Sequence, residues 1–303
     1  MALLTILVVA TLLRCAYLGR EIRYDEARTY LRTARHSLWH VTTRYESPNN
    51  HVLHSVLVHF STRLFGNSPY AIRLPALLAG IGVVWVTYQL GRVYFGSNAA
   101  LLAAGLAAGW LPLVDYSVNA RGYSLQALLV GLVFVNIERI CRGVSGRTPF
   151  ITGLLLAFAL WTIPTGSFAV LAALLQVLLR CGRRLRDWRL LGDIGTLFGS
   201  GAVASLVLYG PILLRPGNAL LSNRWVAPLS ASEFWSGFPE YPRQIWGWIN
   251  GEPSRTMEWI ILGCLVASCL GLARVRVRRG LLVCVCLLVA GLVLMMARRM
   301  LPF

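Results

Sequence analysis

The residues best suited to chemistry lie in a polar segment that runs from about residue 19 to residue 72. Two adjacent carboxylates, Asp25 and Glu26, stand in this segment among several arginines. A carboxylate can act as a general base toward an attacking hydroxyl group, and a guanidinium such as that of Arg28 can bind an anion through two hydrogen bonds. The same spacing also suits two ordinary acids in the first turn of a helix, where negative charge is stabilised.

Two further arginines, Arg73 and Arg121, stand beside long apolar runs. The order of the runs places both at the same, outer side of the membrane. An arginine there can extend to lipid headgroups without any further role. An ionisable residue near membrane depth is more often functional, and arginine matches the geometry of phosphate. Both residues are therefore candidates for binding an anion.

Two amphipathic helices are expected in the polar segment. The first carries an apolar face of Ala27, Tyr30, Leu31, Ala34 and Leu38 at helical spacing. The second begins after Asn50, a good N-cap residue, and its polar face carries His51, Ser55 and His59. It is too short and too polar to span a bilayer, so both helices are expected to lie on the membrane surface. The stacked polar face could bind a metal ion, although polar histidines at an interface are the commoner case.

The composition of the 303-residue chain is that of a membrane protein. Hydrophobic residues make up 56% and charged residues only 14%, with a mean hydropathy of +0.62. A soluble protein would carry about a quarter charged residues. We predict an all-α polytopic protein, a single module over residues 1–303, with about nine transmembrane helices. The spans are expected near 2–18, 73–90, 98–114, 122–137, 150–163, 166–180, 193–213, 257–273 and 281–297. The 150–180 stretch is too long for one span and suggests two short helices.

The short loops between these spans indicate the orientation. Three of them, near residues 139–147, 180–189 and 274–279, are rich in arginine and fall on one side, which should be the cytoplasm. The two long polar segments, 19–72 and 214–256, are then extracytoplasmic. The expected location is the inner (plasma) membrane of a bacterium.

The charge and the cysteines exclude other classes. The net charge is +17 and all 29 basic residues are arginine, but the arginines lie in loops, and no soluble domain is present to bind nucleic acid. The seven cysteines lie in apolar runs or at their arginine-rich ends, so no disulfide framework is expected. Cys284 and Cys286 form a C-x-C in an apolar helix and are not expected to bind metal.

Several motifs, taken in order, resemble the GT-C glycosyltransferases of the branch that holds protein O-mannosyltransferases and aminoarabinose lipid A transferases. The Asp25-Glu26 pair looks like the D-E motif of the first outer loop in that family. The other matching segments are Asn50-His51-Val52-Leu53, Phe65-Gly66, Ala71-Ile72-Arg73-Leu74-Pro75, Tyr88–Gly96 and Tyr116-Ser117 with Ala120-Arg121-Gly122-Tyr123. The resemblance covers residues 24–123, and beyond residue 140 it is one of hydropathy only.

The resemblance implies a GT-C-like fold and an inverting transfer of a sugar from a polyprenyl-phosphate donor to a protein, lipid or glycan acceptor. In this scheme Asp25 is the general base, and Arg73, Arg121 and Arg28 stabilise the charge that develops on the phosphate. Glu26 positions the acceptor or, with His51, holds a divalent cation, which is the only cofactor implied. The other substrate-binding candidates, taken from the matched motifs, are Asn50, His51 and Tyr123.

Two departures from the family pattern keep other functions open. Val52 stands where the family usually has proline, which leaves the type of acceptor open. The chain also ends earlier than the family usually does, so we expect a C-terminally short form. A non-catalytic homologue is therefore one alternative. The other is a transporter or lipid flippase, although few ionisable residues fall at mid-span and no repeat relates the two halves.

Overall fold

The computed structural model describes residues 1–47, 50–220, 230–237 and 240. The chain divides into two units, residues 1–223 and 224–303. Of the second unit the structure describes helix α12 (Ala231–Gly237). All elements of the first unit that the structure describes are helical, which confirms the predicted all-α class.

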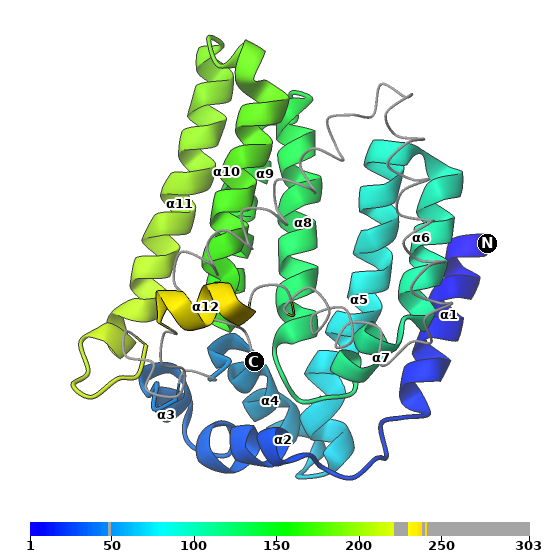
Figure 1. Ribbon diagram of the computed structural model, residues 1–303, viewed down its shortest axis with the longest axis vertical. Coiled ribbons are helices and arrows are strands. Elements are labelled where there is room, and N and C mark those ends of the chain that lie inside the picture. Colours follow the sequence, from blue (N-terminus) through cyan, green and yellow to red (C-terminus); the bar gives the residue numbers. More distant parts are fainter. Residues whose placement is uncertain (48–49, 221–229, 238–239, 241–303) are drawn as a thin grey trace. The chain divides into compact units, whose positions relative to one another are not determined.

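Helices of the first unit match the predicted spans (Figure 1). Those long and apolar enough to cross a membrane are α5 (Pro69–Phe95), α8 (Tyr123–Cys141), α10 (Ser167–Cys181, with the turn before it) and α11 (Trp188–Leu213). The pair α6 (Ser97–Gly109) and α7 (Leu111–Ser117), bent by 62° at Trp110, makes a fifth when it is counted as one span. Shorter apolar helices are α1 (Ala2–Cys15) and α9 (Thr148–Thr162). The spans expected at 257–273 and 281–297 lie outside the described residues.

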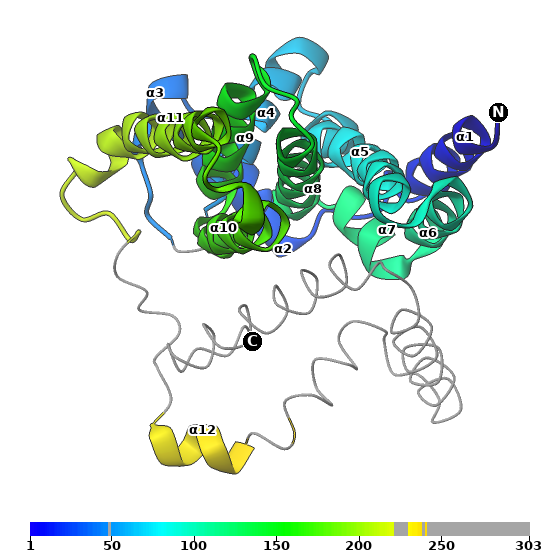
Figure 2. The same ribbon diagram turned by 90° about the horizontal axis from the view of Figure 1, so that it is seen from above.

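The helices of the first unit stand side by side in a row. Seen from above, α1 and α6 lie at one end of the row, α5 and α8 at its centre and α11 at the other end (Figure 2). Helix α10 packs against both α8 and α9. The two short helices predicted within residues 150–180 are present, because α9 ends at Thr162 and a turn at Pro164–Gly166 precedes α10. Gly166 permits this turn, since a Cβ there would lie 2.8 Å from the Ala159 carbonyl oxygen.

Arg14, for which no role was predicted, explains how the bent α6–α7 pair is held. Its side chain is fully buried and donates hydrogen bonds to the carbonyl oxygens of Ala108 (2.9 Å) and Ala107 (3.5 Å), which the end of α6 leaves without helical partners. Its Nε donates to the Ser117 hydroxyl at 3.0 Å, at the end of α7. The guanidinium therefore joins α1 to both sides of the bend.

The polar segment forms a layer of short helices at one end of the first unit. This layer contains α2 (Tyr24–Thr29), a single π-helical turn η1 (Tyr30–Ala34), α3 (Leu38–Thr43) and α4 (Val52–Phe65). The α8–α9 and α10–α11 connections, which carry the arginine-rich loops, lie at the opposite end (Figure 1). Ser68 caps α5 by accepting a hydrogen bond from the Ala71 amide at 3.2 Å, and α5 therefore starts within this layer.

The polar face of α4 is turned into the protein, an orientation that was not predicted. His51 and Ser55 are buried, whereas Leu64 and Phe65 are exposed. The inward face has partners there: His59 Nδ1 lies 2.9 Å from the Ala34 carbonyl oxygen. His51 and His59 therefore have hydrogen-bonding partners inside the protein, whereas the buried Ser55 hydroxyl has none among the described residues.

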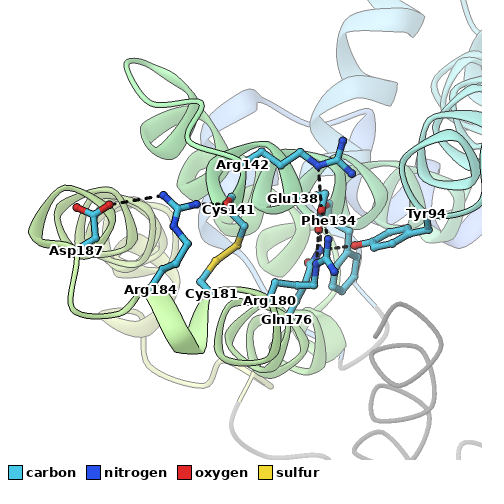
Figure 3. Close-up of a disulfide and its surroundings, with 10 residues drawn as sticks. All are labelled: Tyr94, Phe134, Glu138, Cys141, Arg142, Gln176, Arg180, Cys181, Arg184 and Asp187. Carbon is cyan, nitrogen blue, oxygen red and sulfur yellow. Dashed lines mark hydrogen bonds and ion pairs between the residues drawn. A yellow bond between two sulfur atoms is a disulfide. The ribbon is translucent and has the colours of Figure 1, made fainter. Parts of the chain in front are cut away.

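The expectation of no disulfide is also wrong. Cys141 and Cys181 are joined, with their Cα atoms 5.7 Å apart, at the ends of α8 and α10 (Figure 3). One turn earlier, Glu138 is paired with Arg180, whose Nε donates to it at 2.8 Å. The two helices run side by side and end at the same level, so residues 40 positions apart meet. Spacing along the sequence did not reveal this contact because the packing of α8 against α10 creates it.

Candidate active site

Glu26 is the structural centre of the short-helix layer. Its side chain is fully buried, and each carboxylate oxygen accepts two hydrogen bonds. Oε1 accepts from Arg73 Nε and from the Ala120 amide, both at 2.8 Å. Oε2 accepts from Arg73 Nη2 at 2.7 Å and from the Arg23 amide at 2.9 Å. Burial raises the pKa of Glu26, but the bonds from Arg73 and the two amides outweigh burial and leave this pKa below its ordinary value.

Arg73 is held as completely as Glu26. It is 1% exposed, and beyond its two bonds to Glu26 it donates to three carbonyl oxygens. These belong to Leu18 (2.6 Å), Arg20 (2.7 Å) and Glu21 (2.8 Å). A guanidinium has five N–H donors, so none is left for a phosphate oxygen. The phosphate-binding role expected for Arg73 therefore does not fit, and its bonds instead fasten the start of α5 to the chain before α2.

The neighbours of this buried pair open onto a pocket. Asp25 is exposed, and among the described residues no side chain forms an ion pair or hydrogen bond with its carboxylate. The positions that face the pocket on α2 and η1 follow helical spacing from Asp25. The pocket is lined by Asp25, Arg28, Thr29, Arg32 and Thr33 from that face, by His40, Arg44, Glu46, Ser47 and Asn50 from the chain that follows, and by Arg121. Four arginines thus surround two acids.

Arg121 enters the pocket from the connection between α7 and α8. It is 3% exposed and donates from Nη1 to the Thr29 hydroxyl at 2.9 Å. The residue before it, Ala120, donates its amide to Glu26. Two pairs of adjacent residues, Asp25-Glu26 and Ala120-Arg121, therefore meet. Glu26 and Ala120 bond to each other, while Asp25 and Arg121 both face the pocket. One carboxylate and one guanidinium therefore line the same pocket.

His51 lies behind Arg121. It is 2% exposed, and its Nδ1 accepts the Gly122 amide hydrogen at 2.7 Å. The neutral ring therefore carries its proton on Nε2, which packs 3.2 Å from Arg121 Nη2 without accepting a hydrogen bond from it. Burial lowers the pKa of His51 well below its ordinary value, with Arg121 and His54 adding to the effect, so the imidazole is neutral. Gly122 permits this contact, because a Cβ there would lie 3.1 Å from His51 Nδ1.

Tyr123 packs beside this group and does not line the pocket. It is 38% exposed, and its ring meets that of His51 edge-on at 4.8 Å between centroids. The Arg121 guanidinium lies 5.9 Å from the Tyr123 ring centroid. Tyr123 therefore contacts His51 and lies near the Arg121 guanidinium.

The divalent-cation site suggested for Glu26 and His51 does not fit the geometry. Both Glu26 oxygens are already occupied by N–H donors, and His51 Nδ1 accepts an amide hydrogen. Within the described part of the chain, no group of three or more His, Cys, Asp or Glu side chains is placed to hold a metal ion. No step of a reaction is therefore assigned to a cation at these residues.

The structure divides the predicted site residues into two groups. Those on the pocket are Asp25, Arg28, Asn50 and Arg121, and those that support them are Glu26, His51, Arg73 and Tyr123. Arg32, His40 and Arg44 also line the pocket and were not predicted to do so. Arg32 had a usable signal, since it lies seven residues after Asp25 and hence on the same helical face. His40 and Arg44 had none, because the fold of the following chain brings them there.

Comparison with known proteins gives one family. The sequence model described as dolichyl-phosphate-mannose-protein mannosyltransferase matches residues 49–210, which is more than half of the chain and includes His51, Arg73 and Arg121. No curated protein and no solved structure matches the chain. With its apolar helices and this match, the chain belongs to the dolichyl-phosphate-mannose-protein mannosyltransferase family, and it is a membrane glycosyltransferase.

Proposed function

We propose that this protein transfers a sugar from a polyprenyl-phosphate donor to an acceptor group in the pocket between α2, α3 and Arg121. One observation carries the proposal. Asp25 and Arg121, from positions 96 residues apart, face the same pocket because Glu26 bonds to the amide of Ala120. Transfer from a phosphate leaving group requires a base and a fixed cation that face the same pocket.

Asp25 acts on the acceptor and Arg121 acts on the leaving phosphate. As the acceptor oxygen bonds to the anomeric carbon, the bond from that carbon to the phosphate oxygen breaks, and a single displacement of this kind inverts the configuration. Negative charge then develops on the phosphate. Arg121, oriented in advance by its bond to Thr29, stabilises this charge without having to reorganise, and Arg28 adds a second cation. Asp25 accepts the proton that the acceptor releases.

The side of the membrane follows from the distribution of arginine. The arginine-rich connections after α8 and α10 lie at the end of the first unit opposite the pocket. Short loops rich in arginine remain in the cytoplasm, so the pocket is extracytoplasmic and the Cys141–Cys181 disulfide lies at the cytoplasmic end, an unusual place for a disulfide. We infer that the protein lies in a bacterial inner (plasma) membrane, where a polyprenyl carrier presents its sugar at the outer headgroup level.

Transfer assays with paired variants test the proposal. The full chain, reconstituted in lipid nanodiscs, is supplied with labelled polyprenyl-phosphate sugars and membrane extract as acceptor. Asp25→Asn should lower turnover by about 10²- to 10⁴-fold, because it removes the base. Arg35→Gln is the matched control, since Arg35 is exposed near the same helix and does not line the pocket. Near-normal turnover by Asp25→Asn would show that the assignment of the base is wrong.

A further inference from the structure

A second pocket adjoins the candidate active site. It is formed by residues 43–46, which end and follow α3, and by residues 215–218, which follow α11. Its cavity volume is about 180 Å³, whereas that of the pocket with Asp25 and Arg121 is about 50 Å³. The larger of these two spaces therefore lies beside the candidate active site and not within it.

Arg44 and Glu46 stand between the two pockets. Both residues line both cavities, and Arg44 Nη1 lies 3.0 Å from a Glu46 carboxylate oxygen. Their side chains are 44% and 60% exposed, and an ion pair as exposed as this contributes little free energy. A bound molecule can therefore extend from one pocket into the other past this pair and exchange hydrogen bonds with it.

The second pocket is held together by specific bonds, although 172 positions separate Thr43 from Arg215. Arg215 Nη1 donates to the Thr43 hydroxyl at 2.9 Å, and the Ala219 amide donates to the Tyr45 carbonyl oxygen at 2.7 Å. Gly217 forms the turn between these two bonds, and its φ of +77° lies in the left-handed region that favours glycine. The wall is therefore formed before any ligand binds.

The side chains of this pocket suit a ligand rich in hydroxyl groups. Arg215 is half-buried and forms no ion pair within the described chain, so it has N–H donors beyond the one that Thr43 accepts. Glu46 uses one carboxylate oxygen on Arg44, and the other oxygen remains an acceptor. A sugar hydroxyl both donates and accepts, so a wall that combines guanidinium donors with a carboxylate matches a saccharide.

Two other classes of ligand fit this pocket less well. An alkyl chain would displace water from Arg215 and Glu46 without offering either a hydrogen bond. An extended peptide is commonly bound by the edge of a sheet or by apolar pockets for its side chains, and the described residues of this pocket provide neither. The chemistry of the wall therefore favours a glycan.

We propose that the second pocket binds the sugar units of a glycan acceptor that lie beyond its reacting hydroxyl, with Arg215 and Glu46 as binding side chains. This inference rests on the proposed function, because it places the reacting hydroxyl at Asp25. The reaction joins the donor sugar to the acceptor oxygen, breaks the bond from that sugar to the phosphate and moves the hydroxyl proton to Asp25. It goes beyond the proposed function by naming the class of acceptor and the site that selects it.

The linkage of the product tests the class of acceptor. The full chain in lipid nanodiscs is supplied with labelled polyprenyl-phosphate sugars and membrane extract, and the labelled product is permethylated for linkage analysis. We expect the label to be joined to another sugar. Label joined to a peptide hydroxyl, or to a lipid without an intervening sugar, would overturn the glycan inference while the proposed function stands. Absence of any labelled product would count against the proposed function itself.

Variants of the second pocket test the site. Arg215→Gln should raise the extract concentration needed for the half-maximal rate about tenfold, as expected for losing a charged hydrogen bond. The kcat at saturating extract and the KM for the donor should not change. Thr43→Val removes the bond between Thr43 and Arg215 but keeps the guanidinium, so its effect should be smaller. Arg35→Gln, a change of the same type at an exposed position outside both pockets, should have no effect.

Three results would show that this pocket does not bind the acceptor. Arg215→Gln could behave like Arg35→Gln, or it could have no larger effect than Thr43→Val, which would reduce its role to holding the wall. It could also lower kcat and leave the half-saturating extract concentration unchanged. Melting temperatures of the variants, compared with that of the unchanged protein, exclude loss of folding as the cause.

Discussion

Glu26 and Arg73 form a buried, two-point ion pair, in which Nε and Nη2 of the arginine lie 2.8 and 2.7 Å from the two carboxylate oxygens. The pair connects α2 to α5, and the Ala120 amide attaches the α7–α8 connection to the same carboxylate. Its function is to align the chain on either side of the pocket, whereas Asp25 and Arg121 face the space in which transfer takes place.

Separate substitutions of the adjacent acids Glu26 and Asp25 should therefore distinguish an effect on stability from an effect on catalysis. Glu26→Gln leaves the Arg73 charge buried without its partner, which costs about 3–5 kcal/mol of unfolding free energy in comparable cases. We expect a clearly lower melting temperature in detergent for Glu26→Gln and no change for Asp25→Asn, although both lose transfer activity. Equal melting temperatures for the two variants would contradict the division drawn between them.

Removing the hydroxyl that holds Arg121 should lower turnover without disturbing the fold. Thr29→Val keeps the size of the side chain but deletes the acceptor of the 2.9 Å bond from Arg121 Nη1. A less well-oriented guanidinium stabilises the leaving phosphate less, and we expect kcat at saturating donor to fall about tenfold. Thr33→Val, which also lines the pocket and has no bond to Arg121, is the control and should retain its kcat. If both variants behave alike, Thr29 does not position Arg121.

Acid should destabilise the protein through His54. This side chain is fully buried, and neither ring nitrogen has a hydrogen-bond partner within the described chain. Burial, followed by the charge of Arg121, lowers the pKa of His54 from 6.5 to about 3. Between these values the unfolded chain binds a proton that the folded chain does not, so stability falls as pH falls through this window, by about 1.4 kcal/mol per pH unit.

A leucine in place of His54 should reduce this loss. Melting temperatures measured from pH 7 to pH 4.5 should fall less steeply for His54→Leu than for the unchanged protein. His36→Gln, at a half-buried position, should keep the full slope. An identical slope for all three proteins would show that His54 does not account for the sensitivity to acid.

The disulfide should make the first unit sensitive to reduction. A crosslink across 40 residues corresponds to about 4 kcal/mol in the chain-entropy description. Cys141→Ser should therefore melt at a lower temperature than the unchanged protein, and a reductant should lower the melting temperature of the latter only. Cys15→Ser, which removes an exposed free thiol, is the control. If the reductant has no effect on the unchanged protein, the two cysteines are not joined.

Periodicity and hydropathy predicted most of the architecture. Apolar length located α5, α8 and α11, and the proline and glycine between residues 162 and 167 indicated the break before α10. These features depend on local chemistry, since span length follows from bilayer thickness and the break follows from residues that cannot continue a helix. They could therefore be recognised without knowledge of any contact.

The different roles of Arg73 and Arg121 in the site could not be predicted in the same way. The spacing made Arg73 and Arg121 look alike, because both are arginines at the start of an apolar helix. What distinguishes them is the set of backbone carbonyls at residues 18, 20 and 21, which occupy Arg73. A carbonyl oxygen is present in every residue and leaves no trace in the sequence. The inward face of α4 escaped prediction for the same reason, since His59 meets a carbonyl oxygen.

The contacts of Arg14 imply an order of events during biosynthesis. All of its partners outside α1 are supplied by residues 93 to 103 positions later in the chain. A guanidinium in an apolar helix is costly in lipid until such partners exist. The ribosome must therefore synthesise the chain as far as Ser117 before the first helix can reach its final depth, and until then the Arg14 cation lacks these partners.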